Sequence, residues 1–320
     1  MLGRQVFSVD DEGYRWEDVV LAARAWGEWA TVESGAAEGV ACAHRAAAEG
    51  APFSQDDLGS AASAFRYARH LLAGDEMKAW LERWELDVEG WEDFIRRSLM
   101  RERWSAELAE TAARFPAPAG EVSRALWVDA ICSGALEAFA HALAARAAVH
   151  AALDPPAERA PETASRIALL EESFHRFRER VLTSEALEQL VRARETDWLR
   201  FQCRALTFPH EGMAREAALC VRDDGMELEE VAGNAGASVE RLHVLLEDAE
   251  PPLEDLLVSA GEGELLGPLP VGERFLLVSV DSKTNPSLED SSIRERAERE
   301  LVERAVRQEA INRVRWHERL

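Results

Sequence analysis

The chain has 320 residues, of which 47% are hydrophobic and 30% charged, enough for packed cores beneath a charged surface. Sixty acidic residues against 37 basic ones give a net charge of −23, which repels a phosphate backbone, so we expect no nucleic-acid partner. The N-terminus has no apolar segment typical of a secretory signal, and charged residues interrupt the most apolar stretch, 125–153. We therefore expect a cytoplasmic protein with no membrane partner.

The first two-thirds of the chain carries helix signals almost throughout. Ser54 is predicted to cap a helix that ends near Gly74, and Asp75 to cap a short helix through Trp84. Asp87 is predicted to cap the next helix, in which apolar residues recur at i, i+3, i+4 and i+8. These residues are Trp91, Phe94, Ile95 and Leu99.

Two proline-containing segments, 115–120 and 154–161, are predicted to break this helical region. A helix is predicted over 162–182, and Ser184 is predicted to cap a short helix after it. The first break is interpreted as a joint between sub-domains.

From about Trp198 the pattern changes to short strands and helices. Strands are predicted over 198–208, 242–246 and 275–280, and helices over 213–223, 228–232 and 252–260. The first of these strands competes with a helical interpretation, because Trp198 and Phe201 repeat the spacing of Trp91 and Phe94. The resulting order, β-α-α-β-α-β, is that of a small α+β module.

Ser292 and Glu295 form a capping-box pattern that opens a final helix. Residues 291–320 carry eight arginines and six glutamates, so this mildly basic helix is expected to dock onto the acidic body. The fold class is therefore α+β and mostly α. We predict a helical N-terminal domain, a helical segment completing the body, the module and the C-terminal helix, over 1–115, 121–195, 196–283 and 284–320.

The segment 263–268, Gly-Glu-Leu-Leu-Gly-Pro, resembles the end of a parvulin-type prolyl isomerase domain, where such a turn leads into a strand with a catalytic histidine. The predicted helices over 214–232 resemble the first two helices of that domain. With its helical body and returning helix, the chain resembles SurA/PrsA-type isomerase-related chaperones, specifically over about 196–283. Its layout and its ending, 312–317, also resemble isomerase-related peptide-maturation proteins linked to ribosomally made natural-product peptides (RiPPs).

The sequence departs from that family at its catalytic positions. The histidines expected on the first and last strands are replaced by Arg204 and Phe275, and the glycine-rich segment before the third helix is missing. The barrier to isomerisation is about 18–20 kcal/mol, and lowering it requires polarising and desolvating the X–Pro amide. The resemblance therefore implies a degenerate module with no catalytic residue. The peptide-binding residues expected in it are Arg204, Leu206, Phe208, Phe275 and Leu277.

The helical body holds a group of tryptophans that has two interpretations. Trp80, Trp84 and Trp91 fall on neighbouring helix faces, and Trp104 extends the set. The group either packs in the core or lines an aromatic groove for an extended peptide. On the second interpretation Trp84 and Trp91 belong to the predicted peptide-binding site.

Patterns for other chemistry are absent from the sequence. The four cysteines include no C-x-x-C pair and predict reduced, mostly buried thiols. His141 and His150 lie nine residues apart, too far for a metal-binding pair at i, i+4. No G-x-S-x-G, H-E-x-x-H, P-loop or G-x-G-x-x-G pattern occurs. We expect no metal and no cofactor.

The sequence thus predicts a non-catalytic peptide-binding protein of the isomerase-related chaperone type. It would hold an unfolded or precursor peptide, with basic segments, for a peptide-modifying enzyme. Two alternatives stay open: an active prolyl isomerase that uses backbone and apolar groups, and a scaffold subunit of a peptide-modifying enzyme complex.

Overall fold

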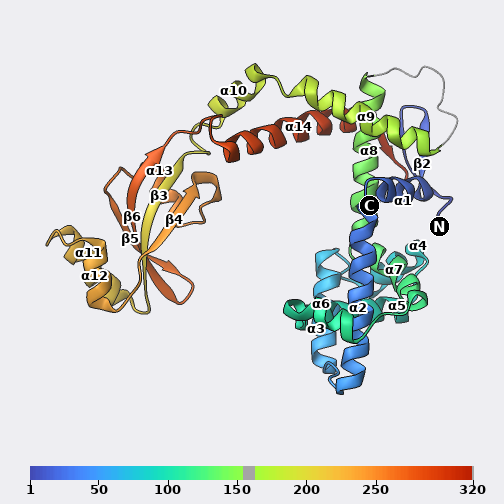
Figure 1. Ribbon diagram of the computed structural model, residues 1–320, viewed down its shortest axis with the longest axis horizontal. Coiled ribbons are helices and arrows are strands. Elements are labelled where there is room, and N and C mark those ends of the chain that lie inside the picture. The colour runs from blue at the N-terminus through green and yellow to red at the C-terminus, as the bar shows by residue number, and fades with distance from the viewer. Residues whose placement is uncertain (154–162, 319–320) are drawn as a thin grey trace. The chain divides into compact units, whose positions relative to one another are not determined.

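The computed structural model describes residues 1–153 and 163–318, less the side chains of 163–165 (Figure 1). The fold is α+β and mostly helical, as the sequence predicted. The break predicted at 154–161 lies outside the described residues. The described residues include two small antiparallel sheets, and each is described below with the helices around it.

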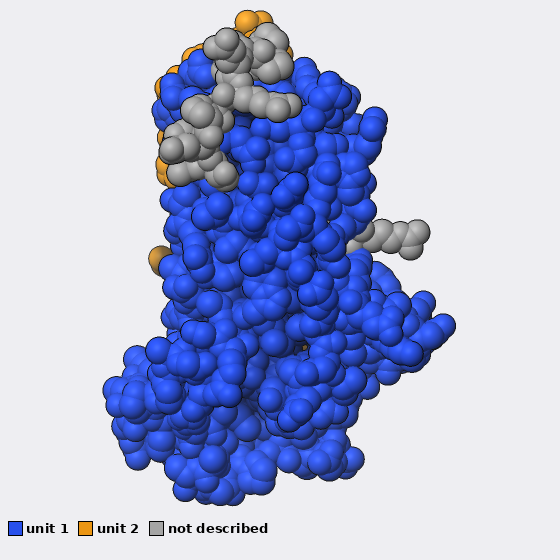
Figure 2. Space-filling view, turned by 90° about the vertical axis from the view of Figure 1, so that its right-hand side faces the viewer, with its two compact units in different colours: residues 1–177, 306–320 blue, residues 178–305 orange. Residues whose placement is uncertain are grey.

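The chain folds into two compact units. Unit 1 comprises Met1–Phe177 and Val306–Leu320, and unit 2 comprises Arg178–Ala305. The sub-domain joint predicted at 115–120 therefore falls within unit 1. Figure 2 shows one face of unit 1 in space-filling form.

Unit 1 holds a three-stranded sheet that joins the two ends of the chain, with strand order β2-β1-β7. Its strands are β1 (Gln5–Val9), β2 (Glu12–Arg15) and β7 (Val314–Trp316). Phe7 is fully buried and stacks on Tyr14 with ring centroids 4.8 Å apart. The predicted helical character of the first two-thirds is wrong at β1 and β2, because strands this short carry little periodic signal.

The helices of unit 1 follow the predicted caps in part. Their bounds are α1 (Trp16–Ala25), α2 (Trp29–Glu49), α3 (Gln55–Ala68), α4 (Gly74–Trp84), α5 (Val88–Arg103), α6 (Leu108–Arg114), α7 (Ala119–Cys132), α8 (Ala135–Leu153) and α9 (Thr163–Val181). Ser54 and Asp87 cap α3 and α5 as predicted, each accepting a hydrogen bond from a first-turn backbone N–H. Asp75 lies within the first turn of α4, whose N-cap is Ala73.

The core of unit 1 forms around the alanine-rich α8. Small side chains let neighbouring elements approach it closely, and α8 packs against α1, α7 and β1. Leu136, Ala140 and Leu143 of α8 are almost completely buried. Among the described residues no single helix is long and apolar enough to cross a membrane; α7 and α8, bent by 66° at their break, pass that test only as a pair.

Unit 2 contains a four-stranded sheet with strand order β4-β3-β6-β5 (Figure 1). Its elements are α10 (Ser184–Ala193), β3 (Arg200–Phe208), α11 (Glu211–Arg222), α12 (Leu228–Ala235), β4 (Glu240–Leu245), the 3-10 turn η2 (Leu246–Asp248), α13 (Leu253–Ser259), β5 (Leu265–Val271) and β6 (Arg274–Thr284). The three predicted strands and three predicted helices of the module are confirmed, each within a few residues of its expected bounds.

The segment interpreted from sequence as a turn is a fourth strand, β5. Its pairing with β6 is irregular between Leu266 and Leu269, where Gly267 and Pro268 interrupt the ladder. Gly267 has a φ of +101°, and a Cβ there would lie 2.6 Å from the carbonyl oxygen of Leu276. Only glycine fits this close approach of two strands. The turn signal was therefore real, but it marks an irregularity within a strand.

Alternate residues of β3 and β6 serve two separate cores, as expected from the pleat of a sheet. Cys203 and Ala205 lie opposite Val280 and Val278 and pack beneath α13. On the other face, Leu206 lies opposite Leu277 and packs beneath α11 and α12. Both faces of the central strands are therefore covered by helices over much of their length.

The final helix, α14 (Ser291–Arg313), begins in unit 2 and ends in unit 1. Ile293, Ala297 and Leu301 pack with α10 in a separate apolar cluster. At its other end the Arg313 guanidinium group donates a hydrogen bond to Asp10 at 3.1 Å, so the predicted contact with the body is confirmed. Ser292 lies inside the helix rather than at its cap, and its backbone N–H donates to Asp290.

Candidate functional site

The five residues predicted to bind peptide in the module lie on one face of the sheet. Arg204, Leu206 and Phe208 alternate along β3, while Leu277 and Phe275 lie opposite Leu206 and Phe208 on β6. Their common face is the one covered by α11 and α12. Phe275 and Leu277, which are separated by one residue on β6, thus share a face, as the alternation of a strand requires.

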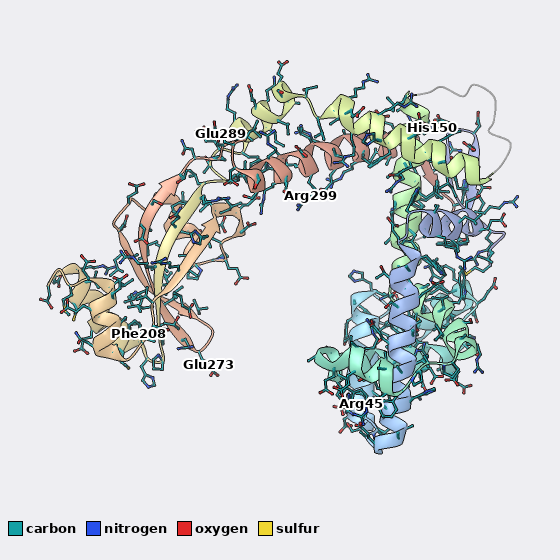
Figure 3. The ribbon with its side chains drawn as sticks, viewed as in Figure 1. Arg45, His150, Phe208, Glu273, Glu289 and Arg299 are labelled. Carbon is teal, nitrogen blue, oxygen red and sulfur yellow. The ribbon has the colours of Figure 1, made fainter. Side chains whose placement is uncertain are left out.

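Three of these side chains are core residues in this structure. Leu206 and Leu277 are fully buried and Phe208 is 1% exposed, because α11 and α12 pack directly over them. Phe208 lies at the end of β3 (Figure 3), with the half-buried Phe275 opposite it. The sequence prediction of a peptide-binding site at these residues did not include the layer of helices α11 and α12 that covers them. Peptide binding by these residues stays a prediction.

Arg204 is held by two carboxylates. Its Nε donates to Asp281 at 2.8 Å, and its Nη1 donates to both oxygens of Glu229 on α12, at 2.8 and 2.9 Å. Asp281 occupies a bulge in the β3–β6 ladder, which turns its side chain toward Arg204. The hydrogen bond from Arg204 lowers the pKa of Glu229, and the hydrogen bonds to Glu229 and Asp281 raise the pKa of Arg204.

The rest of this sheet face, towards β4, is polar. Gln202 lies opposite His243, and Arg204 lies opposite Arg241, on the side of β3 away from β6. Gln202, Arg241 and His243 are exposed. Within the described residues no group of three or more His, Cys, Asp or Glu side chains is placed to hold a metal ion. This part of the sheet face thus presents a polar, charge-paired surface.

Trp84 and Trp91, the two predicted site residues of the helical body, differ in their surroundings. Trp84 is fully buried, with its ring centroid 5.1 Å from that of Trp16 and 6.4 Å from that of Trp80. Trp91 is 8% exposed, meets Phe65 edge to face, and lines a small cavity of about 190 Å³ beside Ile95. Trp84 is therefore a core residue, whereas Trp91 forms part of the wall of a cavity. A peptide-binding role for either residue stays a prediction.

A larger open groove lies between α3 and α5 of unit 1, with a volume of about 730 Å³. Its wall is mainly apolar, with a few polar side chains at the rim. The apolar lining consists of Phe53, Ala61, Ala64, Phe65, Phe94, Ile95 and Leu99, with Cys132 also contributing. Ile95 also lines the small cavity beside Trp91, so the two hollows share a wall residue on α5. We call the larger one the α3–α5 groove.

The rim of the α3–α5 groove carries both signs of charge. Arg103 lies over the ring of Phe53, 3.7 Å from its centroid, and donates to the Ala51 carbonyl at 2.8 Å. The Asp57 carboxylate is engaged in the α3 capping box with Ser54. Glu102, which is exposed, completes the charged part of the rim. The groove thus combines an apolar lining with charged residues of both signs.

Sequence analysis did not locate this groove. The helical spacing of Trp91, Phe94, Ile95 and Leu99 predicted only one apolar face of the helix that is α5. In the structure Trp91 and Ile95 are buried, whereas Phe94 and Leu99 stay partly exposed. An apolar stripe that its neighbours do not fully cover cannot be told from a buried one by periodicity alone.

Another cavity of unit 1, of about 620 Å³, has many charged residues in its lining. His44 and Glu121 face each other there at 2.8 Å. Arg97, another lining residue, pairs with the largely buried Asp129 at 2.5 Å. Burial raises the pKa of Asp129, opposed by the hydrogen bond from Arg97. The His44–Glu121 hydrogen bond joins α2 to α7, and the Arg97–Asp129 ion pair joins α5 to α7, so both contacts hold these helices together.

Comparisons with known proteins find likeness in structure alone. No family model matches the sequence, and no curated protein matches it. The peptidylprolyl isomerase PrsA of Bacillus anthracis aligns with a TM-score of 0.30 and 9% identity, over 73% of this chain and 92% of that one. The foldase PrsA of Streptococcus pneumoniae aligns with a TM-score of 0.27 and 13% identity, over 73% and 74%.

A SurA-like chaperone of Campylobacter jejuni aligns over 99% of this chain and all of that one, with a TM-score of 0.20 and 9% identity. The chain is thus similar, at low TM-scores, to PrsA foldases and SurA-like chaperones. Its closer assignment to parvulins or to RiPP maturation proteins stays a prediction.

Proposed function

We propose that this protein binds extended or unfolded segments of other polypeptides and holds them without isomerising their X–Pro bonds. The observation that carries the proposal is the α3–α5 groove, about 730 Å³ in volume and lined mainly by aromatic and aliphatic side chains. Clefts of this size and character suit apolar ligands, with a few polar groups fixing orientation. A groove of this volume accommodates several side chains of an extended segment.

The arrangement of Arg204 and Phe275 supports holding rather than turnover. An isomerase needs groups that polarise or desolvate the twisted amide. Arg204 is permanently charged, and its Nε and Nη1 donors are already engaged by Asp281 and Glu229 of the same chain, so few donors remain. Phe275 has no polar group to offer. The proposed client is an unfolded or precursor peptide with basic segments, held in the cytoplasm for a peptide-modifying enzyme.

The proposal predicts that polar substitutions in the groove weaken client binding. Phe94→Ser and Leu99→Ser place a hydroxyl group in the apolar wall while altering partly exposed positions. Each should weaken binding of a reduced, alkylated, permanently unfolded polypeptide about tenfold, which corresponds to about 1.4 kcal/mol. Fluorescence anisotropy with the labelled polypeptide measures the affinity.

The matched control is Leu72→Ser, which makes the same exchange at a side chain 63% exposed, outside the groove lining. It should leave the affinity within about twofold, because isolated exposed apolar residues contribute little. Equal losses in all three variants, or no binding by the parent protein, would contradict the proposal. Circular dichroism on each variant separates lost binding from lost folding.

A further inference from the structure

The two edges of the unit 2 sheet differ in their ability to accept another strand. β5 forms one edge and contains Pro268 and Pro270, which have no N–H to donate. β4 forms the other edge, has no proline, and pairs only with β3 on its inner side. Within the described part of the chain, no strand occupies the outer side of β4. Its outward backbone groups are therefore open to an added strand.

An apolar shelf lies along β4 on the face covered by α13. Leu242 and Val244 alternate along the strand and are half-buried against the core beneath α13. Leu253 and Leu256 of α13, also half-buried, belong to the same cluster. On the opposite face the exposed Arg241 and His243 offer polar contacts. A strand added to β4 would place every second side chain beside this shelf.

The charge around this edge indicates which peptide would bind. Residues 240–255, which form β4, η2 and the start of α13, hold six acidic residues and one basic residue, a net charge of −5. Among the described residues, Glu250, Glu254 and Asp255 beside the shelf form no ion pair, whereas Glu247 and Asp248 pair with Arg296. Such a field attracts a cationic peptide and accelerates its encounter with the edge.

We propose that β4 binds a cationic, extended peptide segment as a fifth strand of the unit 2 sheet. Backbone hydrogen bonds to β4 would supply affinity, and alternate apolar side chains on the shelf would supply specificity. Small polar residues would face Arg241 and His243, and basic residues at the ends would meet the acidic surroundings. This inference rests on the proposed peptide-binding function and assigns it a second site with its own ligand chemistry.

The test uses the full-length chain and a synthetic probe. The probe alternates valine with serine or threonine over seven residues and carries two lysines at each end. Fluorescence anisotropy should show saturable binding that weakens with added salt, since the screening length falls from about 10 Å at 0.1 M to about 3 Å at 1 M. A probe with glutamate in place of lysine should bind about tenfold more weakly at low salt.

Backbone N-methylation of alternate residues in the probe tests strand addition without changing the protein. If the probe pairs with β4, one of the two alternating methylation sets should weaken binding about tenfold, because it removes the inter-strand donors. Binding that neither set affects would overturn the proposal.

Substitution of β4 supplies a second, independent readout. Val244→Arg places a long cation on the shelf and should weaken probe binding about tenfold. The matched control, Val271→Arg, makes the same exchange at a 53% exposed residue of the opposite edge strand and should stay within about twofold. Equal effects of the two variants would count against β4 as the site.

Two further outcomes decide what binds the outer edge of β4 and whether the α3–α5 groove acts separately from it. If sedimentation velocity shows a dimer that Val244→Arg converts to monomers, the edge belongs to a second copy of this chain and the proposal is overturned. The groove variant Leu99→Ser should weaken binding of the unfolded client far more than binding of the probe. Loss of client binding in that variant alone supports the groove, and loss of probe binding in Val244→Arg alone supports β4, so each site can fail separately.

Discussion

At the scale of single residues, Arg204 is held by two carboxylates of its own chain. Glu229 and Asp281 each approach its guanidinium group to 2.8 Å. The Arg204 side chain is 26% exposed and that of Glu229 56%, so the pairs are solvated and contribute little to stability on their own. They fix α12 to the sheet face and leave Arg204 few free donors.

A single substitution at this residue should be visible as a change in titration. Arg204→Met removes the hydrogen bond that lowers the pKa of Glu229, so that pKa should rise towards its ordinary value. In the parent protein the small stabilisation from this pair is present above the unfolded-state pKa of Glu229. It is lost as the pH falls through the lower, folded-state pKa. The variant should lack this loss.

Carbon-detected NMR of the Glu229 carboxyl group measures the shift in pKa. Arg215→Met is the matched control, because Arg215 pairs with Glu211 on α11 and should leave the titration of Glu229 unchanged. A Glu229 titration that is identical in the parent and in Arg204→Met would show that the ion pair does not form in solution.

At the scale of elements, the capped helices of unit 1 and the alternating strands of unit 2 were predictable from sequence. The shortest strands were not. The caps at Ser54 and Asp87 have a local physical cause, a side-chain oxygen that accepts from a first-turn N–H, and the sequence shows it directly. β7 has three residues, and its partner β1 lies at the other end of the chain. No local pattern specifies such a pairing.

The candidate site, too, could be predicted only as far as local sequence patterns specify it. The sequence placed Phe275 and Leu277 on one face correctly, because alternation is a local property of a strand. Which face stays open depends on where α11, α12 and α13 pack, and that is a tertiary property. The partial exposure of Phe94 and Leu99 on α5 was hidden for the same reason, so the groove could not be located from sequence.

The strand β7 should contribute measurably to the stability of unit 1. Trp316 packs against Phe7 with ring centroids 5.3 Å apart and against His141 at 4.6 Å. Because the side chain is only half-buried, Trp316→Ala should lower the free energy of unfolding by on the order of 2 kcal/mol, less than a fully buried tryptophan. Urea unfolding followed by far-UV circular dichroism measures the loss.

Ile311→Ala is the control for that measurement. Its side chain is 71% exposed on α14, a few residues before β7, and its removal should cost less than about 0.5 kcal/mol. If Trp316→Ala is as mild as Ile311→Ala, the pairing of the two chain ends contributes nothing to unit 1.

At the scale of the whole molecule, the two units offer different surfaces to a peptide. Unit 1 presents the apolar α3–α5 groove, where shape and burial of side chains would select the ligand. Unit 2 presents an acidic sheet edge, where charge and backbone pairing would select it. In both places binding is proposed at surfaces that the fold leaves open, and no bond-making or bond-breaking step is proposed at either.

We propose that the protein binds polypeptide without isomerising its X–Pro bonds. One paired measurement can test both parts of this proposal. An X–Pro peptide is monitored by NMR exchange spectroscopy with the protein present, beside an anisotropy titration of an unfolded polypeptide. We expect the cis and trans forms of the X–Pro bond to exchange at the uncatalysed rate, over about tens to hundreds of seconds. We also expect saturable binding of the unfolded polypeptide that Phe94→Ser weakens. Accelerated exchange that disappears in Phe275→Ala would contradict the proposal and identify the protein as an active isomerase.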